Sequence, residues 1–225
     1  VLMGISVQVP ASAEWYSETI YPCLVTTVGR VMGLFPFSVA ELCLYLLVFG
    51  FAVSVVILIV RNIRYGGGAG RTFSWFSKII LTVGILAVLY TVGCGINYHR
   101  VSFSEKEGIV TFRYSTEELK EVCIWLTEEV NAVSEDVSRD SSGLMELDAP
   151  EEEGAVEAMG KLAEIFPSLD GYYPRPKTVT VSEILSYQGL SGVYSPFTVE
   201  ANYNGDMTAY NKPFTACHEL SHLRG

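Results

Sequence analysis

The chain has 225 residues, 49% of them apolar, and a formal net charge of −10. This length suits one or two modest domains, and the apolar share favours a chain that lies partly in a bilayer. Residues 1–95 carry five bases and three acids, a net charge of +2, whereas residues 96–225 carry 10 bases and 22 acids, a net charge of −12. An acidic region without a basic patch argues against nucleic-acid binding. The five scattered cysteines show no CxxC spacing and argue against a disulfide framework.

The N-terminal segment, residues 1–13, is apolar but too short to cross a bilayer. It is either the trailing end of a truncated membrane span or the remnant of a signal peptide. Residues 14–36 carry few charges and include Trp15, Tyr16 and Tyr21, whose amphipathic rings suit the headgroup region. We therefore predict an interfacial segment at 14–36 that lies along the membrane surface.

Two apolar runs, Val39–Val60 and Ile79–Ile96, are long enough as helices to cross about 30 Å of hydrocarbon. Glu41, near the start of the first run, is either a functional intramembrane carboxylate or a solvated N-terminal residue compatible with the helix dipole, and we favour the second interpretation. Residues 61–78 carry four bases and no acid, which predicts a cytoplasmic loop by the positive-inside rule. Residues 100–225 are then expected on the outer side of the membrane.

The outer region shows the patterns of helices and of a few short strands, which predicts an α+β domain. Capping residues, amphipathic stripes and β-branched runs define its expected elements. In chain order these are a helix that begins at the Ser115–Glu118 capping box, a helix at Glu152–Phe166, a strand at 178–181, a short helix at 182–189, and extended pieces at 192–195 and 198–203.

The motif that carries chemistry is His218-Glu219-Leu220-Ser221-His222. On a helix, the spacing of four residues puts both imidazoles on one face, where they can bind one Zn²⁺ ion. Glu219 lies beside the first ligand and is the candidate catalytic base, because its carboxylate can take a proton from a water that attacks a carbonyl. An exposed helix with two incidental histidines is the alternative interpretation. Two of the three histidines of the chain belong to the motif, which favours a zinc site.

Two ligands do not complete a catalytic zinc site, which usually has three from the protein. No residue upstream of His218 is a compelling third ligand. Cys217 precedes His218, but its side chain would point about 100° away on a helix, so packing is its expected role. A Cys123–Cys217 disulfide is a weaker alternative for an extracytoplasmic domain.

The stretches from Gly192 to Asn204 and from Pro213 to Gly225 resemble the bacterial membrane family known as domain of unknown function 3810. The upstream segments 14–16, 20–22 and 35–38 are also similar to that family. The resemblance implies a zincin-like metallopeptidase domain that is truncated here at its C-terminus. It also implies a truncated span before Val1 and, as in the gluzincins, a glutamate zinc ligand from the next helix.

The segment 192–204 is expected to be either a turn or the edge strand that holds a peptide substrate by backbone pairing. In the second case, the candidate substrate-binding residues are Tyr194, Glu200, Asn202 and Asn204. Three tyrosines are candidates to donate a hydrogen bond to an oxyanion, and no spacing argument chooses among Tyr194, Tyr203 and Tyr210.

The sequence thus predicts a membrane α-helical region at residues 1–99 and an α+β zincin-like metallopeptidase domain at residues 100–225. The expected function is zinc-dependent hydrolysis of peptides or proteins outside a bacterial cytoplasmic membrane, with the lipid bilayer as the second partner. The alternative is a non-catalytic membrane sensor or assembly protein that uses the same fold. A transporter is disfavoured, because two spans without paired intramembrane charges offer little pathway.

Overall fold

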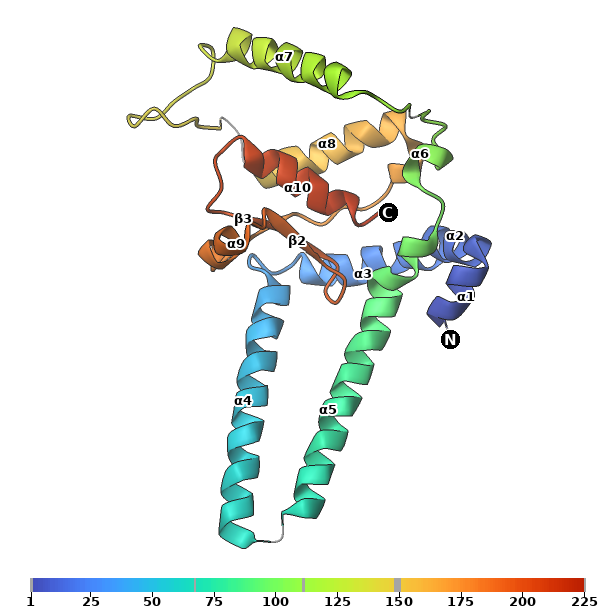
Figure 1. Cartoon of the computed structure of the whole chain (residues 1–225), viewed down its shortest axis with the longest axis vertical. Helices are drawn as coiled ribbons and strands as arrows, with labels where there is room; N and C mark the ends of the chain where they lie inside the picture. The colour runs from blue at the N-terminus through green and yellow to red at the C-terminus, as the bar shows by residue number, and fades with distance from the viewer. Residues whose placement is uncertain (1, 67, 111, 148–150, 225) are drawn as a thin grey trace.

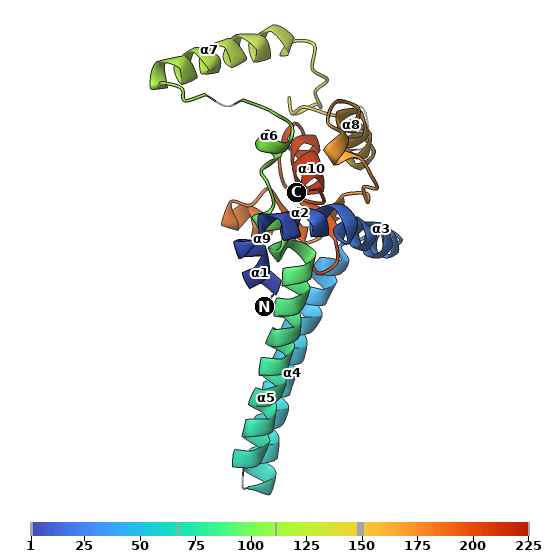
Figure 2. The same ribbon diagram turned by 90° about the vertical axis from the view of Figure 1, so that its right-hand side faces the viewer.

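The computed structural model describes residues 2–66, 68–110, 112–147 and 151–224. Two long helices, α4 (Val39–Tyr65) and α5 (Ala69–Tyr90), project from the rest of the molecule side by side (Figures 1 and 2). Both are long and apolar enough to cross a membrane, the second together with its continuation to Gly95. They lie where the two apolar runs of the sequence predict spans.

The predicted loop at 61–78 is wrong, because most of it is helical. Residues 61–65 extend α4 and residues 69–78 form the first part of α5. Lysine and arginine are good helix formers whose long side chains can reach out of the hydrocarbon, so their presence does not end a helix. The turn itself is short, and Gly66 at φ 57° terminates α4 in a conformation that favours glycine.

The chain leaves α5 through a π-helical turn, η1 (Thr91–Gly95), a 3₁₀ turn, η2 (Asn97–His99), and the short helix α6 (Phe103–Lys106). Gly93 in η1 packs directly on the backbone of Pro196, and a Cβ atom at position 93 would overlap the Pro196 carbonyl. The π-turn thus places the C-terminal end of the second long helix against a distant loop of the α/β part.

The N-terminal residues form three helices, α1 (Leu2–Gln8), α2 (Pro10–Thr19) and α3 (Tyr21–Met32). In Figure 1, α3 is roughly perpendicular to α4 and runs from near its sheet-side end toward α5. The predicted segment 14–36 is therefore mainly helical, with Trp15 58% exposed. Its inner side is not free, because Tyr21 and Val25 are buried in the main hydrophobic core. That core draws residues from both sides of the predicted boundary at residue 99.

The α/β part is a three-stranded sheet in the order β1-β3-β2. Strand β3 (Glu200–Asn204) is central, parallel to β1 (Lys177–Val179) and antiparallel to β2 (Gly192–Ser195). Helices α8 (Glu151–Ile165) and α10 (Asn211–Ser221) pack against each other, and α10 packs on β3 and β2. The short helix α9 (Ser182–Gln188) and the 3₁₀ turn η3 (Pro167–Leu169) complete this part.

The two faces of the sheet have different neighbours, because side chains alternate along a strand. Ala201 and Tyr203 point toward α10 and α8 and join the core with Leu220. Glu200 and Asn204 belong to the opposite face. That face meets the N-terminal end of α4 through Glu200, as described below.

Helix α7 (Thr116–Val133) begins at the predicted capping box, with Ser115 and Glu118 bonded reciprocally. It contains no buried residue and projects away from the other helices in both views (Figures 1 and 2). The amphipathic stripe of Leu119, Leu126 and Val130 is present but exposed. Periodicity therefore predicts the helix correctly without predicting its burial.

Candidate functional site

The HExxH motif occupies the end of α10. Ala216 and Leu220 anchor this helix in the core, with no exposed surface. The same helical turn leaves His218 and His222 exposed on the other side. His222 follows the last α-helical residue but keeps helical backbone angles, so the spacing of one turn is maintained. The ring centroids of His218 and His222 are 5.0 Å apart and nearly perpendicular.

Each imidazole stacks on an aromatic ring. His218 lies 6.4 Å from Phe214 of the same helix, and His222 lies 6.0 Å from Tyr194 of β2, measured between ring centroids. Burial and the neighbouring His218 lower the pKa of His222, which favours the neutral imidazole that a metal requires. The two aromatic rings therefore support the imidazoles from the side, and the solvent-exposed side of the histidine pair stays accessible.

Glu219 lies between α10 and β2 and is only 5% exposed. A Cβ atom at position 192 would lie 2.5 Å from Glu219 Oε1, so the missing side chain of Gly192 makes room for the carboxylate. Burial raises the pKa of Glu219 to about 7, against the opposing effect of a hydrogen bond from the Tyr194 backbone. The carboxyl group thus changes protonation close to neutral pH, as a general base requires.

Of the three candidate oxyanion tyrosines, Tyr194 lies beside the histidines. Its hydroxyl shares a hydrogen bond of 2.7 Å with the hydroxyl of Tyr21 in α3, and burial raises the pKa of both phenols. Tyr203 is buried and donates to Glu152 at 2.8 Å. Tyr210 precedes α10 and lies more than two helical turns from His222. The geometry therefore leaves Tyr194 as the candidate of the three.

Glu200, Asn202 and Asn204 do not line the histidine face, contrary to the expectation from the sequence. They lie on the opposite face of β3, 2–3% exposed. The Glu200 carboxylate pairs with the buried ammonium of Lys177 and accepts hydrogen bonds from the first amides of α4. Asn204 donates to Ser186 and to the Leu190 carbonyl. The period of two in a strand separates these side chains from the site.

Strand β2 is the element beside the histidines that fits the predicted edge strand. It pairs with β3 on one side only, within the part of the chain that the structure describes. Gly192 and Tyr194 face α10, because they lie opposite Tyr203 and Ala201 of β3. The edge strand is thus shorter than the predicted segment 192–204, of which the second half is the central strand.

The third metal ligand is not found among the described residues. In the described ranges, no group of three or more His, Cys, Asp and Glu side chains is arranged to hold a metal ion. Cys217 is half-buried beside the Ala155 carbonyl, and burial raises the pKa of its thiol, which agrees with a packing role. Cys123 and Cys217 are both free thiols, so the alternative disulfide is not formed.

The family model described as protein of unknown function (DUF3810) matches residues 16–225. The chain belongs to this family. No curated protein and no solved structure matches it.

Sequence reasoning on this DUF3810 chain missed two features near the site. One is a pocket of about 670 Å³ beside His218, lined by Phe214 of α10, Met159 of α8 and the linker after α5. Arg100 and Lys106 also line it, and both belong to the second feature. The pocket could not be predicted from the sequence, because it forms between elements about 120 residues apart.

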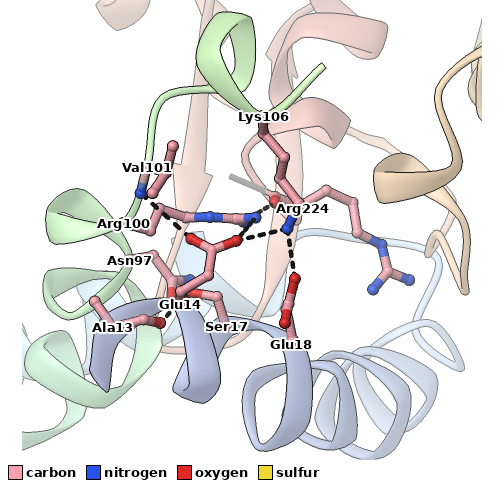
Figure 3. Close-up of polar contacts among 9 residues, drawn as sticks. All are labelled: Ala13, Glu14, Ser17, Glu18, Asn97, Arg100, Val101, Lys106 and Arg224. Carbon is pink, nitrogen blue, oxygen red and sulfur yellow. Dashed lines mark hydrogen bonds and ion pairs between the residues drawn. The ribbon is translucent and has the colours of Figure 1, made fainter. Parts of the chain in front are cut away.

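The second missed feature is the Glu14 cluster, made of Glu14, Glu18, Arg100, Lys106 and the Arg224 carbonyl (Figure 3). The Glu14 carboxylate accepts from Arg100 at 3.4 Å and from Lys106 at 2.5 Å, and Lys106 also reaches Glu18 at 2.6 Å. Arg100 in turn donates to the Arg224 carbonyl, just beyond α10. The cluster therefore joins α2, the linker after α5 and the end of the HExxH helix.

Proposed function

We propose that this chain carries the site of a membrane-anchored, zinc-dependent peptidase. The observation that carries the proposal is the arrangement at the end of α10, where His218 and His222 are exposed while Glu219 is buried against β2. Incidental histidines on a surface helix do not require a buried carboxylate beside them, and burying a carboxylate costs free energy that one backbone hydrogen bond offsets only in part.

The donor set fits zinc in part. His218 and His222 would hold the ion, since imidazole nitrogens one helical turn apart are preferred zinc ligands. The bound ion would supply Lewis acidity to a water molecule and to a substrate carbonyl. The third protein ligand, a glutamate on a following helix by the family resemblance, stays a prediction.

Glu219 would take a proton from the attacking water at its carboxylate and return a proton to the leaving amine. Its burial excludes bulk water from the carboxylate and brings its pKa to about 7. Tyr194 would donate a hydrogen bond from its hydroxyl to the developing oxyanion, because burial raises the pKa of the phenol and keeps it protonated.

The peptide substrate would lie along the edge of β2. An edge strand offers unpaired backbone groups, which can pair with an extended peptide of any sequence. The neighbouring pocket of about 670 Å³ has the size of a small-ligand site and is lined mainly by apolar side chains. It would receive a large apolar side chain of the substrate, beside His218.

We infer an orientation with the site outside the cytoplasmic membrane. Arg61, Arg64, Arg71 and Lys78 cluster at the ends of α4 and α5 that are remote from the sheet. Under the positive-inside rule these ends face the cytoplasm. The sheet, α8 and α10 would then face the opposite side.

The test compares Glu219→Gln with wild type in the full-length protein, purified with zinc. We expect peptide cleavage to fall by about 10²–10⁴-fold, the usual contribution of a general base, while one zinc ion per chain is retained. His218→Ala should lose both cleavage and zinc. Glu183→Gln, an exposed acid on α9, is the matched control and should change neither. Equal cleavage by Glu219→Gln and wild type would refute the mechanism.

One observation favours the non-catalytic alternative. The exposed apolar stripe of α7 is a surface that an assembly partner would cover. A correctly folded full-length protein that binds no zinc would support this second function over the first.

A further inference from the structure

The HExxH helix is held at a fixed position relative to the first span. Lys177 of β1 donates to the Met32 carbonyl at the end of α3 at 2.7 Å and also pairs with Glu200. The Glu200 carboxylate accepts from Ala40 at 2.8 Å, at the start of α4. A cation at a helix C-terminus and an anion at a helix N-terminus both complement the helix dipole, so the contact is favourable at both ends.

A second contact between α4 and the sheet uses a carboxylate from α4. Glu41 in the first turn of α4 accepts hydrogen bonds from the backbone amides of Thr180 at 2.8 Å and Val181 at 3.1 Å. These bonds end β1 two residues earlier than the β-branched run 178–181 would, because the amides of Thr180 and Val181 are diverted from the sheet. Glu41 of α4 thus binds the end of β1, and Glu200 of β3 binds the start of α4, so each element supplies a carboxylate to the other.

The second span is held to the same unit, formed by the sheet, α3, α8 and α10, which we call the body. The Glu14 cluster joins the linker after α5 to the residue that follows the HExxH helix by three positions (Figure 3). Gly93 in the π-turn packs on Pro196, in the loop between β2 and β3. The body therefore contacts both spans near their outer ends, and rotation about one span alone would break contacts with the other.

The site lies close to the bilayer surface as a consequence. Only the sheet separates the first turn of α4 from the histidines, because Glu200 and Tyr194 project from adjacent strands to opposite faces. Packed layers are about 10 Å apart and a helix with its side chains has a radius of about 5 Å, which together put the histidines roughly 15 Å beyond the start of α4. An extended chain advances about 3.3 Å per residue and covers this distance in about five residues.

Exposed apolar residues mark the level of the bilayer surface. Leu34, Phe35 and Phe37, in the connection between α3 and α4, are 81%, 42% and 43% exposed. Such residues are stable at the interface, where their side chains reach the hydrocarbon. Tyr21 of α3 is bonded directly to Tyr194 beside His222, so one hydrogen bond and one ring contact lead from this level to the site.

We propose that the substrate is a polypeptide that is itself anchored in the membrane, cleaved within about ten residues of the bilayer surface. This inference rests on the proposed peptidase function. A chain that leaves the bilayer beside α5 meets the pocket lined by Tyr98 and His218 after a few extended residues. Anchoring substrate and site in one plane raises the effective concentration of the peptide without any new contact.

The experiment uses the full-length protein with zinc in phosphatidylcholine vesicles. The probe is a synthetic hydrophobic helix followed by a mixed-sequence tail of about 30 residues, and mass spectrometry maps the cleaved bonds. The tail is presented in four ways: directly after the helix, after a rigid helical spacer of about 30 Å, after a flexible Gly-Ser spacer with the same number of residues, and free in solution. Glu219→Gln protein is the blank for all four.

We expect the directly attached tail to be cleaved in its first ten or so residues, at least about tenfold faster than the free tail. The rigid spacer should remove this advantage, because it holds the tail about 30 Å from the surface. The flexible spacer should retain part of it, because its chain can fold back and bring the tail to the site. Equal rates with the rigid spacer and without a spacer, or cleavage spread evenly along the tail, would overturn the inference and leave the peptidase function intact. If no presentation is cleaved, the proposed function fails and this inference fails with it.

Discussion

Helices α10 and α7 have a similar amphipathic pattern, but the apolar side is buried in α10 and exposed in α7. Helix α10 is embedded in the body, the unit formed by the sheet, α3, α8 and α10, where Leu220 and Leu223 have no exposed surface. Helix α7 extends from the body, and Trp125 and Leu126 on it are 55% and 48% exposed. Both helices show an apolar stripe, but only one has a surface to cover it.

The difference separates the formation of a helix from its stabilisation. A capping box and 18 residues are sufficient to define α7, yet an isolated helix of that length is marginal in water. Helix α10 has 11 residues and no side-chain cap, and its stability comes from packing on α8 and β3. We therefore expect α7 to open locally at a much lower free energy than α10.

The largest expected effect comes from Glu200, which joins the body to the first span. Glu200→Ala leaves the buried Lys177 ammonium without its carboxylate, so the free energy of unfolding should fall by about 3–5 kcal/mol. Glu129→Ala on α7 removes an equally charged but exposed side chain and should stay within about 0.5 kcal/mol of wild type. Denaturant unfolding in detergent micelles measures both. Similar small changes for the two variants would show that the buried pair does not hold the body.

A leucine pair tests the packing difference itself. Leu220→Ala should lower the free energy of unfolding by about 2–5 kcal/mol, because it leaves a cavity in the core. Leu126→Ala removes the same atoms from an exposed position on α7 and should cost less than about 0.5 kcal/mol. If both substitutions are equally costly, α7 is packed against a surface in solution and the comparison fails.

The smallest effect, about tenfold, concerns thiol reactivity. In variants that keep one cysteine each, Cys123 on α7 should react with a membrane-impermeant maleimide at least about tenfold faster than Cys217, because Cys123 is exposed while burial raises the pKa of the Cys217 thiol. Mass spectrometry after timed quenching gives both rates, and denatured protein is the control in which they converge. Labelling of Cys123 only from the cytoplasmic side would contradict the proposed orientation.

Local patterns in the sequence were sufficient for the elements that depend on near neighbours. The apolar run at 39–60, the capping box at Ser115 and the four-residue spacing of His218 and His222 all appear in the structure where they were predicted. The site differs from the prediction where the pairing of strands distant in the sequence decides which way a side chain points. Whether Glu200 points to the histidines or to α4 depends on its register with β1 and β2, which no local pattern specifies.

The helical boundaries show a similar limit. Residues 61–78 looked like a loop because of their charge, but charge reports where a helix leaves the hydrocarbon and not where it ends. Glu41 lies in the first turn of α4, as predicted, and its bonds to Thr180 and Val181 depend on a segment about 140 residues away.

The contact between Gly93 and Pro196 couples the residues that evolution can place at these two positions, which lie far apart in the sequence. Any side chain at position 93 would push the turn between β2 and β3 away, and β2 carries Gly192 and Tyr194 of the site. Among DUF3810 relatives, a larger residue at the position of Gly93 should therefore occur only together with a rebuilt turn at the position of Pro196. Covariation of these two columns in a family alignment would record the coupling between the turn that follows α5 and the edge strand.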